Sequence, residues 1–515
     1  MSPSDVLSAI VEWAGHEPTA PAVQDLERAL TYGELVDEVA RLAGGLAARG
    51  VEEGDRVALH LPNSVDFVVT ALASLWVGAI FVPLAVTDPP ARVAAIVADC
   101  TPKVVVTGDE VEPGDHAAPG GTPWVTLPDL LGPGTEPAAP LTPDPARVAY
   151  AIYTSGTTGR PKGVLIGNGA FAAAVSSSAT ILGLDHSTRA LCVSPFYFDG
   201  SFGTLFPTLF VGGALVIRPR ESLLFPRTFF RAVQREAITY TGFSPSYLRL
   251  LLASPEIDKL RGSTLEIVAL GGEASSPAEV RALWEAAPGV RVFNRYGPTE
   301  TTIAVTHVEL TPELLADGTV PIGCPHPGVS FHLLDEDGRP VDGTDRVGEL
   351  YIGGSQLMSC YWGAPGLTTD VMRTDVVPQT TVYRTGDLVY VDHRGNYHYV
   401  ERADRVIKRL GVRISLLEVA DAMRSLPGVS TAACVVFHNE GEVGIAAFVV
   451  TDGSVPALDL RTGAREQLPD TMLPDRIELV DELPMTRSSK LDERRLLAEA
   501  GLLEADSDAP RSAIA

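Results

Sequence analysis

Short apolar runs alternate along the chain with longer stretches in which apolar residues recur every three or four positions. Five of the runs are short enough and rich enough in Val, Leu, Ile and Ala to predict buried β-strands, at residues 56–61, 103–107, 190–193, 213–217 and 265–270. Residues 35–49 and 229–236 have the spacing of amphipathic helices. This alternation predicts an α/β fold with substantial parallel sheet.

The pattern changes after residue 399, where the charged run Glu401-Arg402-Ala403-Asp404-Arg405 leads into a new α+β pattern. An ordinary polar loop is the other interpretation of this run. The Gly- and Pro-rich stretches at 112–122 and 132–145 are too short to separate domains and predict surface loops. We therefore expect a large N-terminal domain of layered sheets and helices over residues 1–403 and a small α+β C-terminal domain over residues 404–515.

Composition excludes several classes of protein. The 65 acidic and 40 basic residues give a formal charge of −25, which disfavours nonspecific binding to nucleic acid. No apolar run reaches the ~18 residues of a membrane span, and residues 1–15 lack the basic start of a secretory signal. The five cysteines occur singly, which argues against a zinc site or a disulfide framework. A cytoplasmic protein without nucleic-acid or membrane partners is expected.

A loop dense in glycine and hydroxyl residues follows the apolar residues 148–152. It comprises Thr154, Ser155, Gly156, Thr157, Thr158 and Gly159, with Lys162 shortly after. Glycine allows the backbone to approach a phosphate closely, while N–H and hydroxyl groups donate hydrogen bonds and the lysine adds charge. The loop differs from that of P-loop NTPases, because Lys162 is followed by Gly163 and not by Ser or Thr. We expect it to hold the phosphates of ATP, the alternative being a turn without function.

This loop resembles the signature of the acyl-adenylate-forming superfamily, especially the adenylation domains of nonribosomal peptide synthetases. Further strings resemble the same family in the same order, namely residues 30–35 (LTYGEL), 294–300 (NRYGPTE), 348–354 (GELYIGG), 383–387 (YRTGD) and 488–492 (SSKLD). Together they cover almost the whole chain. The resemblance implies an ATP-dependent enzyme that converts a carboxylic acid into an acyl-AMP, with a mobile C-terminal lid domain.

The resemblance also assigns roles around the nucleotide. Tyr296, with Gly272 and Glu273 on the other side, corresponds to the adenine site. Thr299 corresponds to a residue near the α-phosphate, and Glu300 to the acid that holds Mg²⁺. The cofactors implied are ATP and Mg²⁺.

The ribose and the reacting groups are assigned in the same way. Asp387 matches the acid that binds the ribose hydroxyls, and Arg402 matches the basic residue beside it. Lys490 matches the lysine that bridges the substrate carboxylate and the AMP oxygens, and Asp404 matches the hinge. The spacing of basic residues after Asp404 departs from the family's usual string, so the resemblance implies adenylation more directly than transfer to a thiol.

The residues after Phe198 resemble the segment in which an aspartate, here Asp199, pairs with the ammonium group of an amino acid. The family's remaining pocket positions correspond to Gly200, Gly203, Gly242, Val268, Leu270, Arg295, Ile303, Ala304 and Lys490. The three glycines leave room for a bulky side chain or for an amine placed one carbon further away. A buried Arg295 requires an anion. That anion is either a second carboxylate of the substrate or a protein acid such as Glu273.

Three substrate classes follow from this pocket. A dicarboxylic substrate or a β-amino acid would resemble those of enzymes that load 3-methylaspartate and related β-amino acids for macrolactam polyketides. A small α-amino acid such as alanine is the third. Only residues 491–515 follow Lys490, and they contain no carrier-protein signature. The expected acceptor is therefore the phosphopantetheine thiol of a discrete carrier protein.

Two other functions share parts of this sequence pattern. An acyl-CoA synthetase would use the same first step with free coenzyme A, but Asp199 and the pair Gly297-Pro298 favour the peptide-synthetase branch. A noncatalytic nucleotide-binding relative would be expected to lack one of the residues assigned to catalysis. All of them are present.

Overall fold

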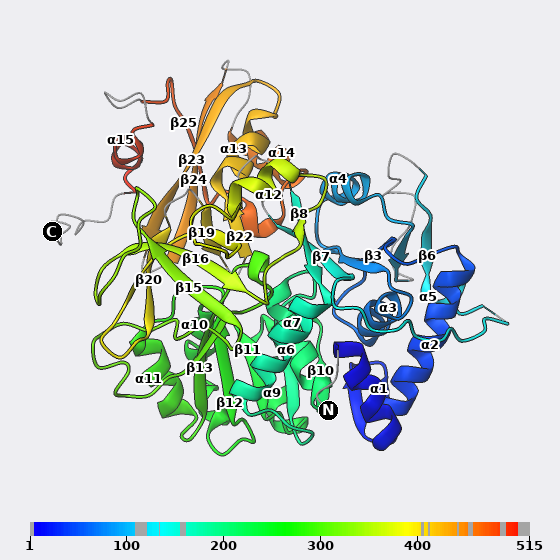
Figure 1. Ribbon diagram of the computed structural model, residues 1–515. Helices are drawn as coiled ribbons and strands as arrows, with labels where there is room; N and C mark the ends of the chain where they lie inside the picture. The colour runs from blue at the N-terminus through cyan, green and yellow to red at the C-terminus, as the bar shows by residue number, and fades with distance from the viewer. Residues whose placement is uncertain are drawn as a thin grey trace.

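The computed structural model describes residues 5–108, 121–132, 134–154, 161–402, 406–409, 412–439, 442–451, 457–484 and 491–502. Its larger, N-terminal part contains three sheets, and a smaller part follows residue 402 (Figure 1). The predicted α/β class with a large N-terminal and a smaller C-terminal part is thus confirmed. No helix among the described residues is both long and apolar enough to cross a bilayer.

The first sheet carries most of the candidate substrate site. In order its strands are β14 (Thr306–Glu309), β13 (Arg291–Tyr296), β12 (Ile267–Gly271), β11 (Tyr240–Phe243), β9 (Arg189–Cys192), β10 (Ala214–Ile217), β1 (Pro21–Gln24) and β2 (Ala29–Thr31). The inner strands pair in parallel, and the outer strands β14 and β2 pair antiparallel with their neighbours. The carboxyl ends of the parallel strands therefore lie along one edge, where α/β proteins bind ligands.

The second sheet carries the candidate phosphate loop. Its order is β17 (Cys360–Tyr361), β8 (Lys162–Gly167), β7 (Val148–Thr154), β4 (Ile80–Pro83), β3 (Arg56–His60), β5 (Val104–Thr107) and β6 (Trp124–Thr126). β7 and β8 form an antiparallel hairpin in which Thr154 lies opposite Lys162. Between them the hairpin brackets residues 155–160, which lie outside the described part of the chain.

Helices join these two sheets into one core. A single cluster of buried side chains includes strands of both sheets and the helices α2 (Tyr32–Ala48), α3 (Val65–Trp76), α6 (Asn168–Leu182) and α7 (Asp199–Phe210). A second cluster lies beneath α9 (Pro226–Arg235), α10 (Pro245–Leu252) and α11 (Pro277–Ala286). Shorter or outer helices are α1 (Val6–His16), α4 (Pro90–Cys100), α5 (Leu127–Leu130), α8 (Arg220–Leu223) and α12 (Pro365–Val371). The five predicted strands and both predicted helices are confirmed, with ends shifted by a few residues.

A third, antiparallel sheet follows the first. Its order is β15 (Val329–Leu334), β16 (Gly348–Gly354), β19 (Val382–Val391) and β18 (Met372–Arg373), with β20 (Tyr397–Arg402) on the other part of β19. Asp387 of β19 and Arg402 of β20 are cross-strand partners, which brings two residues of separate strings together.

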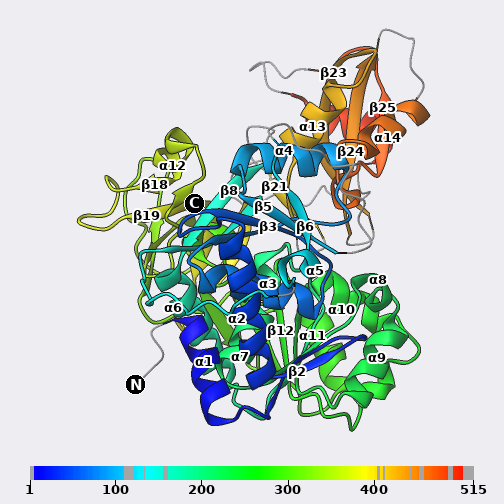
Figure 2. The same cartoon turned by 90° about the vertical axis from the view of Figure 1, so that its right-hand side faces the viewer.

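The C-terminal part contains the hairpin of β21 (Val406–Arg409) and β22 (Val412–Ser415). It also contains a sheet of β23 (Val429–Asn439), β24 (Glu442–Thr451) and β25 (Arg476–Leu479), with helices α13 (Leu416–Arg424), α14 (Ala457–Arg465) and α15 (Glu493–Glu499). It has its own buried cluster and projects beside α4 (Figure 2). There Arg92 of α4 pairs with Asp88 at 3.2 Å and with Glu418 of α13 at 2.5 Å.

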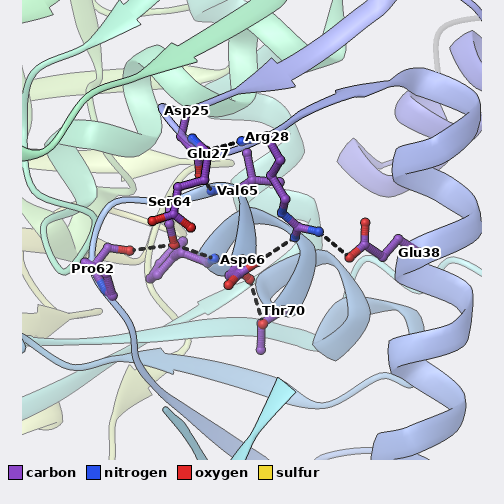
Figure 3. Close-up of polar contacts among 10 residues, drawn as sticks. Asp25, Glu27, Arg28, Glu38, Pro62, Ser64, Val65, Asp66 and Thr70 are labelled. Atoms are coloured by element: carbon purple, nitrogen blue, oxygen red, sulfur yellow. Dashed lines mark hydrogen bonds and ion pairs between the residues drawn. The ribbon is translucent and has the colours of Figure 1, made fainter. Parts of the chain in front are cut away.

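Arg28 connects the β1–β2 hairpin to two helices. Its guanidinium pairs with Glu38 of α2 at 2.7 Å and with Asp66 of α3 at 2.5 Å (Figure 3). Asp25, in the same hairpin, accepts hydrogen bonds from the backbone of Arg28 and of Val65. These contacts fix the hairpin against the start of α3.

Replacing Arg28 by methionine should therefore destabilise the fold. Because the two ion pairs are partly exposed, we expect a loss of about 1 kcal/mol in the free energy of unfolding. Urea denaturation would measure it. Arg339→Met removes an exposed pair with Asp337 and should change stability by less than about 0.5 kcal/mol; equal losses in the two variants would contradict the assigned role of Arg28.

Candidate active site

Asp199 is the first residue of α7 and lies at the carboxyl-end edge of the first sheet. Its Oδ2 atom is buried and has no hydrogen-bond partner among the described residues. Burial raises the pKa of this carboxyl to about 6, and the nearby Glu300 charge adds to the increase. A buried acceptor atom without a partner is costly, and a ligand ammonium group would satisfy it.

Arg295, at the carboxyl end of β13, extends across neighbouring strands toward α7. Its Nη2 donates a 3.2 Å hydrogen bond to the carbonyl of Gly200, and its buried Nη1 has no partner within the described part of the chain. A Cβ built on Gly203 would lie 2.5 Å from Nη1, and one built on Gly242 would lie 3.2 Å from Nη2. Glycine at these two positions thus makes room for the guanidinium. The prediction that these glycines leave open space for the substrate is therefore wrong for Gly203 and Gly242. At Gly200 it is not contradicted, because no atom lies within 4 Å of a Cβ built there.

Glu273, the acid named above as a possible partner of Arg295, does not pair with it. The Oε2 atom of Glu273 accepts hydrogen bonds from the backbone and the hydroxyl of Ser246, and Arg249 lies 3.8 Å away. Arg295 forms no ion pair with any acid in the described part of the chain. The Asp199 charge interacts with that of Arg295 without forming an ion pair, so Nη1 can still donate to a ligand.

Two residues assigned to the pocket lie on the wrong face of the sheet. A Cβ on Gly271 of β12 would lie 2.5 Å from Cγ of Arg295, so Gly271 shares a face with the guanidinium. Successive strand residues point to opposite faces, and Ala269 therefore also faces the pocket side. Val268 and Leu270 point away from it and pack in the cluster beneath α9 to α11. The alternation of side chains along a strand was the signal that could have identified Ala269 and Gly271, and not Val268 and Leu270, as the residues that face the pocket.

Glu300, Lys162 and Tyr361 form a compact polar group. Glu300 is fully buried, and its Oε1 accepts a 2.6 Å hydrogen bond from the hydroxyl of Tyr361. Lys162 Nζ lies 3.2 Å from the same oxygen and 2.7 Å from the Tyr361 hydroxyl. The structure therefore brings together two predicted residues from distant strings and adds Tyr361, which the sequence analysis did not assign.

A second polar group contains three of the five residues assigned to adenosine. Tyr296 donates a 2.5 Å hydrogen bond to Oδ2 of Asp387, and Arg402 donates a 2.8 Å hydrogen bond to Oδ1. Burial, with the Asp387 charge, raises the pKa of Tyr296 well above its ordinary value, so the phenol remains a donor. The group holds both carboxylate oxygens of Asp387 in fixed positions.

The remaining predicted residues are distributed as follows. Gly272 directly follows β12 with φ of 86°, a conformation that glycine adopts without strain. Thr154 is buried at the end of β7, and no described residue forms a hydrogen bond with its hydroxyl. Ser155, Gly156, Thr157, Thr158, Gly159, Asp404 and Lys490 lie outside the described residues.

Comparisons with known proteins identify the family of the chain. Residues 10–362 match the family model of the AMP-binding enzyme, and residues 418–490 match that of the AMP-binding enzyme C-terminal domain. The isonitrile lipopeptide synthase of Streptomyces coeruleorubidus is 35% identical over 509 residues, covering 96% of this chain and 33% of that protein. The dimodular nonribosomal peptide synthase of Bacillus subtilis (strain 168) is 34% identical over 513 residues, covering 94% and 21%. The chain thus spans a third or less of these relatives.

A solved structure shows the same fold. NpsA-ThdA, an artificially fused adenylation-PCP di-domain from Klebsiella oxytoca, superimposes with a TM-score of 0.82 at 23% identity, covering 93% of this chain and 94% of that one. The family model accounts for most of the N-terminal part, and a second model accounts for much of the C-terminal part. The chain therefore belongs to the AMP-binding enzyme family, whose members are AMP-forming ligases, as the resemblance of its motifs indicated.

Proposed function

We propose that this protein activates an amino acid with ATP as an aminoacyl-AMP and then transfers it to the phosphopantetheine thiol of a carrier protein. One observation carries the proposal. The buried Asp199 carboxyl, whose Oδ2 has no partner among the described residues, lies close enough to Glu300 for the two charges to interact, and Glu300 pairs with Lys162 at 3.2 Å. A candidate ammonium site thus lies next to a candidate phosphate site.

Adenylation requires no nucleophilic side chain, because a carboxylate oxygen of the substrate attacks the α-phosphorus. The new bond is the acyl–phosphate bond, and the bond to the β-phosphate breaks to release pyrophosphate. The protein contributes positioning and fixed charge. Asp199 would hold the ammonium, Thr299 would lie beside the α-phosphate, and Lys162 would bind the phosphates. Lys490 is assigned, by its motif, to bridge the substrate carboxylate and the AMP oxygens.

The acidic member of the phosphate site fits Mg²⁺. This ion prefers oxygen ligands and commonly binds one or two protein carboxylates together with substrate phosphates. Glu300 supplies such a carboxylate, and no cluster of three or more acidic, His or Cys ligands occurs in the described regions. When bound, Mg²⁺ would neutralise charge on the departing pyrophosphate. Glu300 would hold the ion, with Lys162 and Tyr361 orienting its carboxylate.

The adenosine would bind at the second polar group. Asp387, oriented by Tyr296 and Arg402, has the acceptor oxygens that two ribose hydroxyls require. Gly272 and Glu273 would lie along the adenine. The two groups together would place the α-phosphate next to Thr299.

The unpaired Arg295 favours an amino acid with a second carboxylate. Its Nη1 is a buried donor without a hydrogen-bond partner among the described residues, and Asp199, the acid whose charge interacts with that of Arg295, forms no ion pair with it. A guanidinium binds a carboxylate through two parallel hydrogen bonds. An amino acid carrying two carboxylates would place one at the α-phosphorus and the other at Arg295, with its amine at Asp199.

Arg295→Ala should therefore impair dicarboxylic substrates selectively. A hydrogen bond to a charged group contributes about 1.5–3 kcal/mol, so kcat/KM for aspartate or 3-methylaspartate should fall about 10- to 100-fold. The value for alanine should change by less than about threefold. Arg295→Lys keeps the charge but not the planar fork and should lie between them. Equal losses with all substrates would make Arg295 a structural residue and contradict this proposal.

The proposal that the acyl group is transferred to a thiol rests on the division of the chain into an N-terminal and a C-terminal part. Residues 404–515 would rotate about Asp404 relative to residues 1–403 and expose the acyl-AMP to the carrier. The similar di-domain structure, which joins adenylation and PCP units, supports a carrier as acceptor. The pairing of Arg92 with Glu418 would then belong to one of the two orientations.

The first test is pyrophosphate release from ATP across α-, β- and dicarboxylic amino acids, with aryl and fatty acids as controls. Release with amino acids is the expected result. Activity only with acids that lack an amine would contradict the role of Asp199. The acceptor is then tested by offering free coenzyme A or a phosphopantetheinylated carrier protein: preference for coenzyme A would identify an acyl-CoA synthetase.

A further inference from the structure

A chain of three buried side chains lies behind the candidate pocket, outside the residues assigned above. His307 Nδ1 lies 2.9 Å from His326 Nε2, and His326 Nδ1 lies 3.0 Å from Oε1 of Gln356. The three side chains come from β14, from the loop before β15 and from the segment after β16. They are 8%, 2% and 1% exposed.

The hydrogen bonds assign a direction to this chain. The amide nitrogen of Gln356 donates to the carbonyl of Ala304 at 2.7 Å and to that of Thr302 at 3.3 Å. The amide oxygen must therefore accept from His326 Nδ1–H, which leaves His326 Nε2 to accept from His307 Nδ1–H. His326 is then neutral, with its proton on Nδ1. Burial is the main cause that lowers the pKa of both histidines, and for His307 the neighbouring His326 and Arg295 lower the pKa further.

The series of hydrogen-bonded side chains from His307 to Gln356 ends at a strained turn of the backbone. Thr302 and Ile303 have φ values of 61° and 67°. Both are β-branched, and such residues avoid this left-handed region unless the surroundings hold them there. The Gln356 amide nitrogen binds carbonyls on both sides of Ile303, and the Thr302 hydroxyl donates to the Gln356 carbonyl at 2.7 Å. Gln356 thus contacts the turn through its side chain and its backbone.

The strained turn also borders the pocket. Cγ2 of Ile303 would lie 3.0 Å from a Cβ on Gly203, the same glycine that faces Arg295. On its other side the turn packs closely against Gly297, where a Cβ would lie 2.6 Å from Cα of Ala304. A relaxed turn would therefore move Ile303 relative to α7 and Arg295.

We propose that Gln356, His326 and His307 are positioning residues that hold the Thr302–Ile303 turn in its left-handed conformation and thereby set the amino-acid pocket. Gln356 makes the contact, and the two histidines fix the orientation of its amide. This role rests on the proposed amino-acid activation, whereas the conformational part stands independently. None of the three side chains needs to touch the substrate.

The test compares Gln356→Leu with the wild-type protein and with Tyr32→Phe. Tyr32 is a matched control because its buried hydroxyl also contacts two carbonyls, those of Leu209 and Gly213, at the opposite end of α7 from Asp199. Crystal structures would give φ at residues 302 and 303, and pyrophosphate exchange would give KM for the amino acid and for ATP.

In Gln356→Leu we expect φ at residue 303 to become negative and KM for the amino acid to rise about tenfold, with KM for ATP changed by less than about twofold. Tyr32→Phe should lower the melting temperature without changing either KM. Retention of both positive φ values in Gln356→Leu would overturn the proposal, and so would a relaxed turn with an unchanged amino-acid KM. If the wild-type protein activates no amino acid, the proposed function fails, and the φ values still decide whether Gln356 holds the turn.

Discussion

Replacing Glu300 by glutamine is expected to lower kcat for pyrophosphate exchange about 100- to 1,000-fold, the range seen when one group that stabilises transition-state charge is removed. The glutamine is nearly isosteric and keeps an oxygen that can accept from Tyr361. It removes the negative charge that would hold Mg²⁺ and that lies 3.2 Å from Lys162. A higher Mg²⁺ concentration should therefore be needed for half-maximal rate.

The control for this variant is Glu236→Gln. Glu236 also forms a partly buried ion pair, with Arg218, but it lies at the end of α9 away from the site. We expect it to lose stability and to retain the exchange rate and the Mg²⁺ requirement. A near-normal rate in Glu300→Gln with an unchanged Mg²⁺ requirement would show that this carboxylate does not bind the ion.

Much of the fold and of the candidate nucleotide site could be predicted from the sequence, because these features depend on local patterns. Apolar runs predicted strands such as Val104–Thr107, and the strings around Tyr296 and Asp387 predicted residues that the structure brings within hydrogen-bonding distance. The strings were informative because each carries its turn and its functional side chain together. That Tyr296 and Asp387 contact each other could be seen only once the pairing of the strands was known.

The pocket was less predictable, because its shape depends on contacts between distant segments. The glycines at 203 and 242 indicated open space, but the side chain of Arg295 occupies it. Val268 and Leu270 were placed by position in the family pattern, and the pleat of β12 turns both away. The hydrogen-bonded chain from His307 to Gln356 has no local signature, since its residues are separated by 19 and 30 positions.

Replacing Asp199 by asparagine is expected to impair catalysis but to increase the stability of the fold. An amide cannot form an ion pair with the substrate ammonium, and removing one partner of a buried ion pair typically costs about 3–5 kcal/mol. KM for the amino acid should therefore rise at least about 100-fold. In the wild-type protein the same KM should rise as the pH falls below about 6, because the carboxyl, whose pKa burial raises to about 6, then becomes protonated.

Stability should change in the other direction. The pKa of Asp199 is about 6 in the folded protein, whereas the ordinary pKa of an aspartate, expected in the unfolded chain, is 3.8. The folded state therefore binds more protons between these values, and its stability decreases as the pH rises through this window. Asparagine cannot ionise, so Asp199→Asn should be more stable than the wild-type protein at pH 7, by on the order of 2 kcal/mol. The difference should disappear toward pH 4.

Asp392→Asn provides a control of opposite sign. Burial alone would raise the pKa of Asp392, but hydrogen bonds from His398 and from backbone N–H groups lower it. Its ionised form thus stabilises the fold above the unfolded pKa, and Asp392→Asn should destabilise the protein at neutral pH. Thermal unfolding of both variants between pH 4 and 8 would separate the two effects. If Asp199→Asn also loses stability at pH 7, the buried carboxylate has a protein partner that offsets its burial, and it is not held in readiness for a substrate ammonium group.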